Sequence, residues 1–197
     1  MVFFDSLNDP MLVRMLAAGA VGVLPTDTVY GLVATAGNPR AVQKLYALKS
    51  RERKPGTTIA ASAEQLIALG VPRLTIERVA KLWPNPLSVV IELDENLAYL
   101  HAGVGSSPFR VVATAALKSL LEKTGPLLTS SANLPGQPPA TNLAEARRYF
   151  GSQVDFYVDG GLRKDNAPST IIRLGSKGAQ VLREGAIPAK KVKELLA

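Results

Sequence analysis

The sequence predicts an α/β fold, a single domain with a twisted, mixed parallel and antiparallel sheet flanked by helices. Short apolar runs rich in β-branched residues alternate with helical patterns along the whole chain. The last strand-like runs follow one another without a helix between them, so part of the sheet is expected to be antiparallel. With 197 residues and no repeat or linker, residues 1–197 are expected to form one domain.

Local signals mark the individual elements. Asn8 or Asp9 precedes Pro10 at one helix start, and Asn38 precedes Pro39 at the next, as is typical of capped helices. Ser62 stands at capping-box spacing from Gln65, as does Asn142 from Glu145. The predicted helices are 8–20, 38–50, 62–70, 75–83, 114–125, 142–151 and 188–197. The predicted strands are 20–25, 32–36, 57–61, 87–93, 109–113, 126–130, 154–161, 169–174 and 179–185.

The composition excludes several classes of protein and of site. There is no cysteine, which excludes disulfides and thiolate metal sites and fits a cytoplasmic chain. The start of the chain does not resemble a secretory signal, and no apolar run is long enough to span a membrane. The net charge of +7 favours a polyanionic partner such as a nucleotide or RNA.

Polar residues gather in three loops at the ends of predicted elements. The stretch "TDTVYG" follows the first strand, "SSANLPG" follows "PLLT", and the basic stretch "KSRERK" ends the second helix. Ligands of interleaved α/β folds bind in such loops. Hydroxyls, an amide and turn N–H groups suit phosphate oxygens, although a plain Ser/Asn turn explains the second loop as well.

The basic stretch has two interpretations. If the chain is extended after Lys49, then Lys49 and Arg51 face the same side and suit one multiply charged anion. Alternatively, these residues form a solvated helix end whose charges favour the helix dipole. The cluster alone favours the second interpretation, because charge runs at the surface are common.

Familiar catalytic motifs are missing. There is no Gly-rich phosphate loop of common spacing, no G-x-S-x-G, and His101 is the one histidine. A lone histidine outside any cluster is more often structural than catalytic. Neither a zinc site nor acyl transfer through a side-chain nucleophile is therefore expected.

Six stretches together resemble the YrdC-type family of threonylcarbamoyl-AMP synthases. They are "LPTDTVYGL", "LYALKSRERKPG", "LWPNPLSVVI", "TSSANLPGQPPA", "PSTIIRL" and "LREGAIP", in this order. The resemblance runs from about Gly19 to Pro188. It is to the single-domain form, so the extra C-terminal domain of longer members is not expected. It implies a YrdC-like fold.

The resemblance also implies an activity. L-Threonine and bicarbonate give a carbamate, which attacks the α-phosphate of ATP and yields threonylcarbamoyl-AMP and pyrophosphate. The enzyme would be a nucleotidyltransferase that uses Mg²⁺ bound mainly through the ATP phosphates. Partner proteins would transfer the product to tRNA, and the chain would be a monomer or a weak homodimer.

The family's site residues carry over position by position. Lys49 and Arg51 would act as catalytic cations on the ATP phosphates. The implied ATP-binding set is Lys49, Arg51, Lys54, Ser106, Ser131, Asn133 and Arg183. The implied threonine-binding set is Thr28, Arg110, Thr129 and Ser169, with the fork of Arg110 suited to a carboxylate.

Departures from the family pattern leave other functions open. The stretch after Arg110 reads "VVATA", Ser88 replaces the usual threonine, and no histidine stands near Ile59. Pro139 takes the place of a serine that helps to bind ATP in some members. One alternative is a diverged paralogue that adenylates another carbamate. Another is a double-stranded-RNA-binding or translation-associated protein, which ranks lower because aromatics for base stacking make up only 6%.

Overall fold

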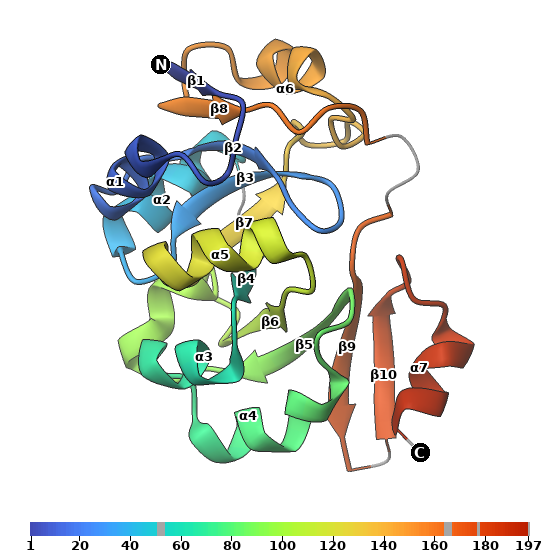
Figure 1. Cartoon of the computed structure of the whole chain (residues 1–197). Helices are drawn as coiled ribbons and strands as arrows, with labels where there is room; N and C mark the ends of the chain where they lie inside the picture. Colours follow the sequence, from blue (N-terminus) through green and yellow to red (C-terminus); the bar gives the residue numbers. More distant parts are fainter. Residues whose placement is uncertain (51–53, 164–166, 177, 197) are drawn as a thin grey trace.

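A computed structural model describes residues 1–50, 54–163, 167–176 and 178–196 of the chain (Figure 1). Its strands are β1 Val2–Phe4, β2 Gly22–Pro25, β3 Tyr30–Thr35, β4 Thr57–Ala60, β5 Leu87–Glu92, β6 Ser106–Val111, β7 Leu127–Ser131, β8 Phe156–Val158, β9 Thr170–Gly175 and β10 Gly178–Arg183. Its α-helices are α1 Pro10–Ala17, α2 Pro39–Leu48, α3 Ala63–Leu69, α4 Arg73–Val79, α5 Ala115–Thr124, α6 Leu143–Phe150 and α7 Ala189–Leu196. Two 3₁₀ helices, η1 Ala80–Leu82 and η2 Glu95–Leu100, complete the described elements.

All described strands join one sheet in the order β1-β8-β2-β3-β7-β4-β6-β5-β9-β10. The pairs β1–β8, β2–β8, β4–β6 and β5–β9 are parallel. The pairs β2–β3, β3–β7, β4–β7, β5–β6 and β9–β10 are antiparallel. The predicted mixed sheet is therefore confirmed, including the antiparallel pairing of the last two strands.

Helices cover both faces of the sheet because side chains alternate along each strand. Leu24 and Val33 point to a core cluster that includes Leu16 of α1 and Leu120 of α5. Their neighbours Val23 and Leu32 point to the opposite cluster, which includes residues of α2, α4, α6 and α7. The strand β2 is accordingly buried along its whole length. Figure 1 shows α1 and α5 in front of the central strands and α2 behind them.

The helix caps form as the local signals predict. The Asp9 carboxylate accepts from the Met11 N–H, and Asn38 Oδ1 accepts from the Ala41 N–H. Asn142 Oδ1 likewise accepts from the Glu145 N–H. Several predicted boundaries differ from the observed ones, as two examples show. The helix predicted over 75–83 is α4 followed by η1, and the strand predicted over 109–113 lies at Ser106–Val111.

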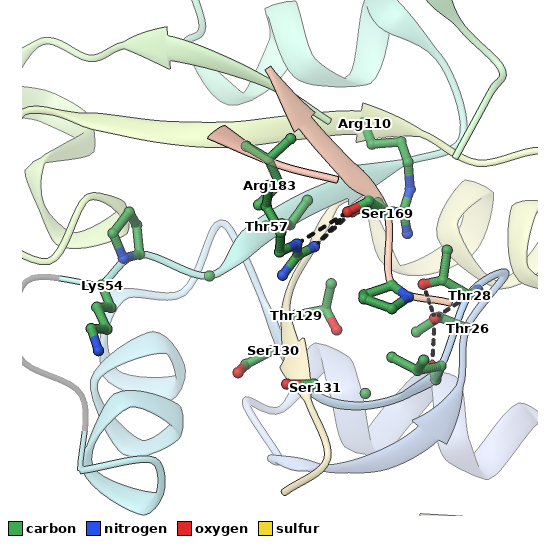
Figure 2. Close-up of a pocket in the computed structure, with 16 residues that line it drawn as sticks. Thr26, Thr28, Lys54, Thr57, Arg110, Thr129, Ser130, Ser131, Ser169 and Arg183 are labelled. Atoms are coloured by element: carbon green, nitrogen blue, oxygen red, sulfur yellow. Dashed lines mark hydrogen bonds between the residues drawn. The ribbon is translucent and has the colours of Figure 1, made fainter. Parts of the chain in front are cut away.

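The loops that carry the polar residues lie close together near the middle of the sheet. The turn between β2 and β3, the end of β7 and the start of β9 approach one another beside β6 (Figures 1 and 2). Among the described residues, no helix is long and apolar enough to cross a membrane.

Candidate functional site

A cavity of about 140 Å³ lies between these loops. Figure 2 shows its lining, which is mostly hydroxyl-bearing and cationic. The lining residues are Thr26, Thr28, Val29, Gly31, Lys54, Pro55, Gly56, Thr57, Arg110, Thr129, Ser130, Ser131, Pro168, Ser169, Ile171 and Arg183.

All four residues expected to bind threonine line this cavity. Thr28 comes from the β2–β3 turn, Arg110 from β6, Thr129 from β7 and Ser169 from the segment that enters β9. All four are buried. They are separated by up to 141 residues in sequence (169 minus 28), so it is the sheet order that brings them together.

The turn that carries Thr28 is closed by its own side chains. Thr26 Oγ1 donates to the Val29 carbonyl at 2.6 Å and accepts from the Thr28 N–H at 3.2 Å. The hydroxyls of Thr26 and Thr28 lie 3.1 Å apart, as the dashed lines of Figure 2 show. Arg163 also donates to the Thr26 carbonyl at 3.0 Å. The turn thus holds the Thr28 hydroxyl at the cavity wall.

Arg110 reaches the cavity because of strand alternation. It lies near the end of β6 and pairs in register with Ile59 of β4, which packs in the cluster under α5. Val112, two residues on and just beyond the strand, packs in the same cluster. Nη2 of Arg110 donates to Asp27 Oδ1 at 2.7 Å. Burial lowers the pKa of the Arg110 guanidinium, while the charge of Asp27 and its hydrogen bond act to raise it. Ile59 itself is fully buried and does not line the cavity.

Ser169 connects two elements of the site. Its hydroxyl lies 2.9 Å from that of Ser88, and both side chains are buried. Its carbonyl accepts from Nη2 of Arg183 at 2.7 Å and from Nε at 3.2 Å. Gly185 allows this approach, since a Cβ there would lie 2.1 Å from the Pro168 carbonyl oxygen. The residue expected to bind threonine therefore contacts one expected to bind ATP.

The basic stretch is split by the structure. Lys54 lines the cavity, whereas Arg51 lies outside the described residues. Lys49 is buried at the end of α2 and does not line the cavity. Its ammonium donates to the Ser131 carbonyl and to Asn133 Oδ1, both at 2.8 Å, and also to the Asn133 carbonyl. Lys49 thus binds the loop that carries two further residues expected to contact the nucleotide.

The remaining expected ATP contacts occupy different positions. Ser131 lines the cavity and donates to Asn133 Oδ1 at 2.7 Å. Asn133 lies next to the cavity rather than in its lining. Ser106 does not line the cavity, because it lies four residues before Arg110 at the other end of β6. There it lies 3.4 Å from Nη2 of Arg173, beside a separate hollow lined also by Glu92 and Asp94.

Sequence reasoning did not assign a role to several residues in the cavity lining or next to it. Asp27 pairs with Arg110, and its position between two threonines of the "TDTVYG" loop is the signal that could have identified it. Gly31 and Gly56 allow close approach of strands, since a Cβ at Gly56 would lie 2.7 Å from the Thr129 carbonyl oxygen. Ser130 Oγ is buried without a hydrogen-bond partner among the described residues.

Comparisons with known sequences identify the family to which the chain is similar. The Sua5/YciO/YrdC family model, described as "Telomere recombination", matches residues 14–185. A Mycobacterium tuberculosis protein named "Putative threonylcarbamoyl-AMP synthase" is 33% identical over 188 residues, which cover 93% of this chain and 87% of that protein. A Mycobacterium leprae protein of the same name is 33% identical over 191 residues, which cover 93% and 86%.

Solved structures share the fold. P. abyssi Sua5 with two substitutions superposes with a TM-score of 0.87 at 26% identity, covering 100% of this chain and 64% of that chain. Its complex with L-threonine gives 0.87 at 24% identity, with 100% and 61% covered. This chain thus spans less than two thirds of those Sua5 chains. E. coli YciO gives 0.78 at 21% identity, with 97% of both chains covered. Since the family model matches most of its length, the chain belongs to the Sua5/YciO/YrdC family.

Proposed function

We propose that the protein is an L-threonylcarbamoyladenylate synthase, which forms threonylcarbamoyl-AMP and pyrophosphate from L-threonine, bicarbonate and ATP. The observation that carries the proposal is the cavity, which combines a buried arginine and hydroxyls with cations at the same opening. The names of the mycobacterial relatives support the activity. The complex of the related P. abyssi Sua5 with L-threonine supports the amino acid.

The amino-acid half of the cavity suits threonine chemically. The Arg110 guanidinium offers parallel N–H donors for the α-carboxylate. The hydroxyls of Thr28, Thr129 and Ser169 offer partners for the substrate hydroxyl and for the carbamate oxygens. These groups come from strands and a closed turn, so they are fixed before substrate arrives.

The nucleotide half would lie toward Lys54, Ser131 and Arg183, which share the same cavity. Lys49 and Arg51 would be the catalytic cations on the phosphates. For Lys49, this requires that ATP take over at least one of the contacts that its ammonium makes with Ser131 and Asn133. Asn133 would then face the nucleotide beside Ser131.

The proposed reaction needs no protein nucleophile. A carbamate oxygen forms a bond to the α-phosphorus of ATP, and the bond from that phosphorus to the pyrophosphate oxygen breaks. Negative charge builds up on the leaving pyrophosphate, so positioned cations lower the barrier. The buried Arg110 holds the amino-acid part at the same time, which keeps the two reactants oriented.

Magnesium would be bound mainly through the ATP phosphates. Among the described residues, no three His, Cys, Asp or Glu side chains are grouped to hold a metal ion, and the cavity lining contains no acid. The oxygen donors at hand are the hydroxyls of Ser130, Ser131 and Thr129, which suit a hard cation that retains several waters. When bound, the ion would offset phosphate charge.

The biological setting is proposed on the same basis. The product would pass to partner proteins that modify tRNA, and the net charge of +7 would favour the approach of tRNA itself. We infer a cytoplasmic protein that acts as a monomer or a weak homodimer.

The test is pyrophosphate release from ATP by the purified chain with bicarbonate and each of the common amino acids. Release that depends on L-threonine is expected, and Arg51→Ala should lower it by roughly 100-fold, as for loss of a transition-state charge partner. Arg40→Ala, at an exposed position on α2, is the matched control and should leave release unchanged. Release stimulated only by another amino acid would support a diverged paralogue, and no stimulated release would overturn the synthase.

A further inference from the structure

Asp27 and Arg110 form a buried ion pair next to the cavity. The Nη2–Oδ1 distance is 2.7 Å, and the two side chains are only 5% and 2% exposed. The other ion pairs among the described residues, such as Lys44–Asp155, each join at least one well-exposed side chain. A buried pair is costly to break, because removal of one partner leaves a charge without compensation.

The pair uses only part of the donor capacity of Arg110. A guanidinium carries five N–H donors, and the bond to Asp27 is the one hydrogen bond that the Arg110 guanidinium makes within the described part of the chain. Its Nε is buried with no partner among these residues. Figure 2 shows the side chain directed toward Ser169 and Thr28 across the cavity. The remaining N–H donors are therefore available to bind an anionic group in the cavity.

Asp27 is not itself part of the cavity lining. It lies in the Thr26–Val29 turn, whose threonines do line the cavity and whose first residue is held by Arg163. Asp27 can therefore influence a bound substrate through Arg110 without touching it. The turn fixes Asp27, Asp27 fixes the guanidinium, and the guanidinium faces the substrate.

We propose that Asp27 is a positioning residue, which holds Arg110 in the orientation that selects an amino-acid substrate by its α-carboxylate. This inference rests on the proposed function, since it assigns the carboxylate to the amino-acid substrate of that reaction. It adds to that function a residue, Asp27, that acts on the substrate carboxylate through Arg110.

Two effects oppose each other when Asp27 is removed. Loss of its negative charge takes away repulsion of the substrate carboxylate, which would tighten binding. The same loss also leaves a buried guanidinium without a compensating anion and with at most a weaker, neutral acceptor, so that it turns away or draws in water. Recognition by two parallel hydrogen bonds depends on orientation, so the second effect outweighs the first. The expected result is weaker carboxylate binding.

The experiment measures dissociation constants by calorimetry for L-threonine and for L-threoninamide, whose neutral amide replaces the carboxylate. Asp27→Asn keeps the shape of the side chain and removes its charge. It should weaken L-threonine binding by roughly 10- to 100-fold, the range for a charge-assisted hydrogen bond, and L-threoninamide binding by less than about threefold. In an Arg110→Met background, Asp27→Asn should have no further effect on threonine binding.

Controls separate positioning from general damage. Asp155→Asn removes an ion pair of the same 2.7 Å length away from the cavity and should change neither constant. If Asp27→Asn does not fold, Asp27→Glu retains the charge and should weaken threonine more than threoninamide.

Equal weakening of both ligands would show a merely structural role and overturn the proposal, as would unchanged or tighter threonine binding. Failure of the wild-type protein to bind threonine, or to release pyrophosphate with it, would instead overturn the proposed function, and this inference with it.

Discussion

The ammonium nitrogen of Lys49 lies 2.8 Å from the carbonyl oxygen of Ser131, so the end of α2 is joined to the end of β7. The same ammonium donates to both oxygens of Asn133. These contacts hold the buried ammonium against the loop that follows β7. These hydrogen bonds give Lys49 a structural role in addition to the proposed catalytic role.

Lys49→Met should therefore affect stability as well as activity. The change removes the charged donor from the oxygens of Ser131 and Asn133, although the Ser131 carbonyl still accepts from the Asn133 N–H and Asn133 Oδ1 from the Ser131 hydroxyl. Loss of these charge-assisted hydrogen bonds should lower the free energy of unfolding by about 1–3 kcal/mol. Threonine-dependent pyrophosphate release should fall by roughly 100-fold. Urea unfolding and the release assay measure the two effects. Lys44→Met is the control, because it removes an exposed ion pair and should lower the free energy of unfolding by only about 0–1 kcal/mol. Equal destabilisation by the two changes would contradict a structural role for Lys49.

Gly31→Ala should close part of the cavity. A methyl group there would lie 2.5 Å from Thr129 Oγ1 and 3.0 Å from Thr26 Cγ2, and both residues line the cavity. We expect about 1–3 kcal/mol of destabilisation from overpacking and a loss of activity on the order of 100-fold from displaced substrate contacts.

Gly37→Ala is the matched control for this change, because its nearest neighbour would be Leu69 Cδ1 at 3.9 Å. Denaturation and activity are measured for both variants. Full activity of the Gly31→Ala protein would show that the space near Thr129 is not used by substrate.

Ser88 and Ser169 should be coupled in a double-mutant cycle. Their hydroxyls lie 2.9 Å apart and are buried, so either single alanine variant removes this contact, although the Ser169 hydroxyl also lies 3.3 Å from Nη2 of Arg183. Each single change should cost about 1 kcal/mol, and the double variant should cost less than the sum. Only variants that lack the Ser169 hydroxyl should also lose threonine affinity, because Ser88 does not line the cavity. Strictly additive stabilities would argue against the contact.

Asp155 should make stability depend on pH in the acid range. Burial alone would raise the pKa of its carboxyl, but the Lys44 ammonium and the Val21 N–H hold the pKa below its ordinary value of 3.8. The folded protein then binds fewer protons at this site than the unfolded chain does. The stabilisation is complete above the unfolded-chain pKa and is lost as the pH falls through the lower, folded value.

Urea unfolding of wild type and Asp155→Asn between pH 7 and pH 3 measures this contribution. The two stabilities should converge toward the acid end. The effect should be small, since both side chains of the pair are partly exposed. A constant gap across the range would mean that protonation of Asp155 does not contribute.

Local signals predicted most elements of the fold, because caps and periodic patterns act over a few residues. Asn38 and Asn142 cap the helices that their positions indicate. The strand β1 was missed, because its three residues are defined by pairing with β8, more than 150 residues later. The 3₁₀ helix η2 was missed as well, since "ENLAYL" carries no strong helical period.

The candidate site was predictable in its residues but not in its contacts. The resemblance supplied Thr28, Arg110, Thr129 and Ser169, and the cavity brings all four together. The partner of Arg110 lies 83 residues earlier, and the acceptors of Lys49 lie more than 80 residues later. No local pattern in the sequence specifies such pairs. Ser106 is the opposite case. The resemblance assigned it to the ATP site, but it lies at the end of β6 that is far from the cavity.

The order of the strands determines when the cavity becomes complete during synthesis. Its walls take residues from position 26 to position 183, and β1 pairs with β8. A chain emerging from the ribosome can therefore form the β2–β3 turn early. The cavity beside that turn stays incomplete until β9 and β10 have been translated. Fragments that end before residue 169 would lack the Ser169–Arg183 wall, so nascent chains would be inactive until nearly the whole sequence has left the exit tunnel.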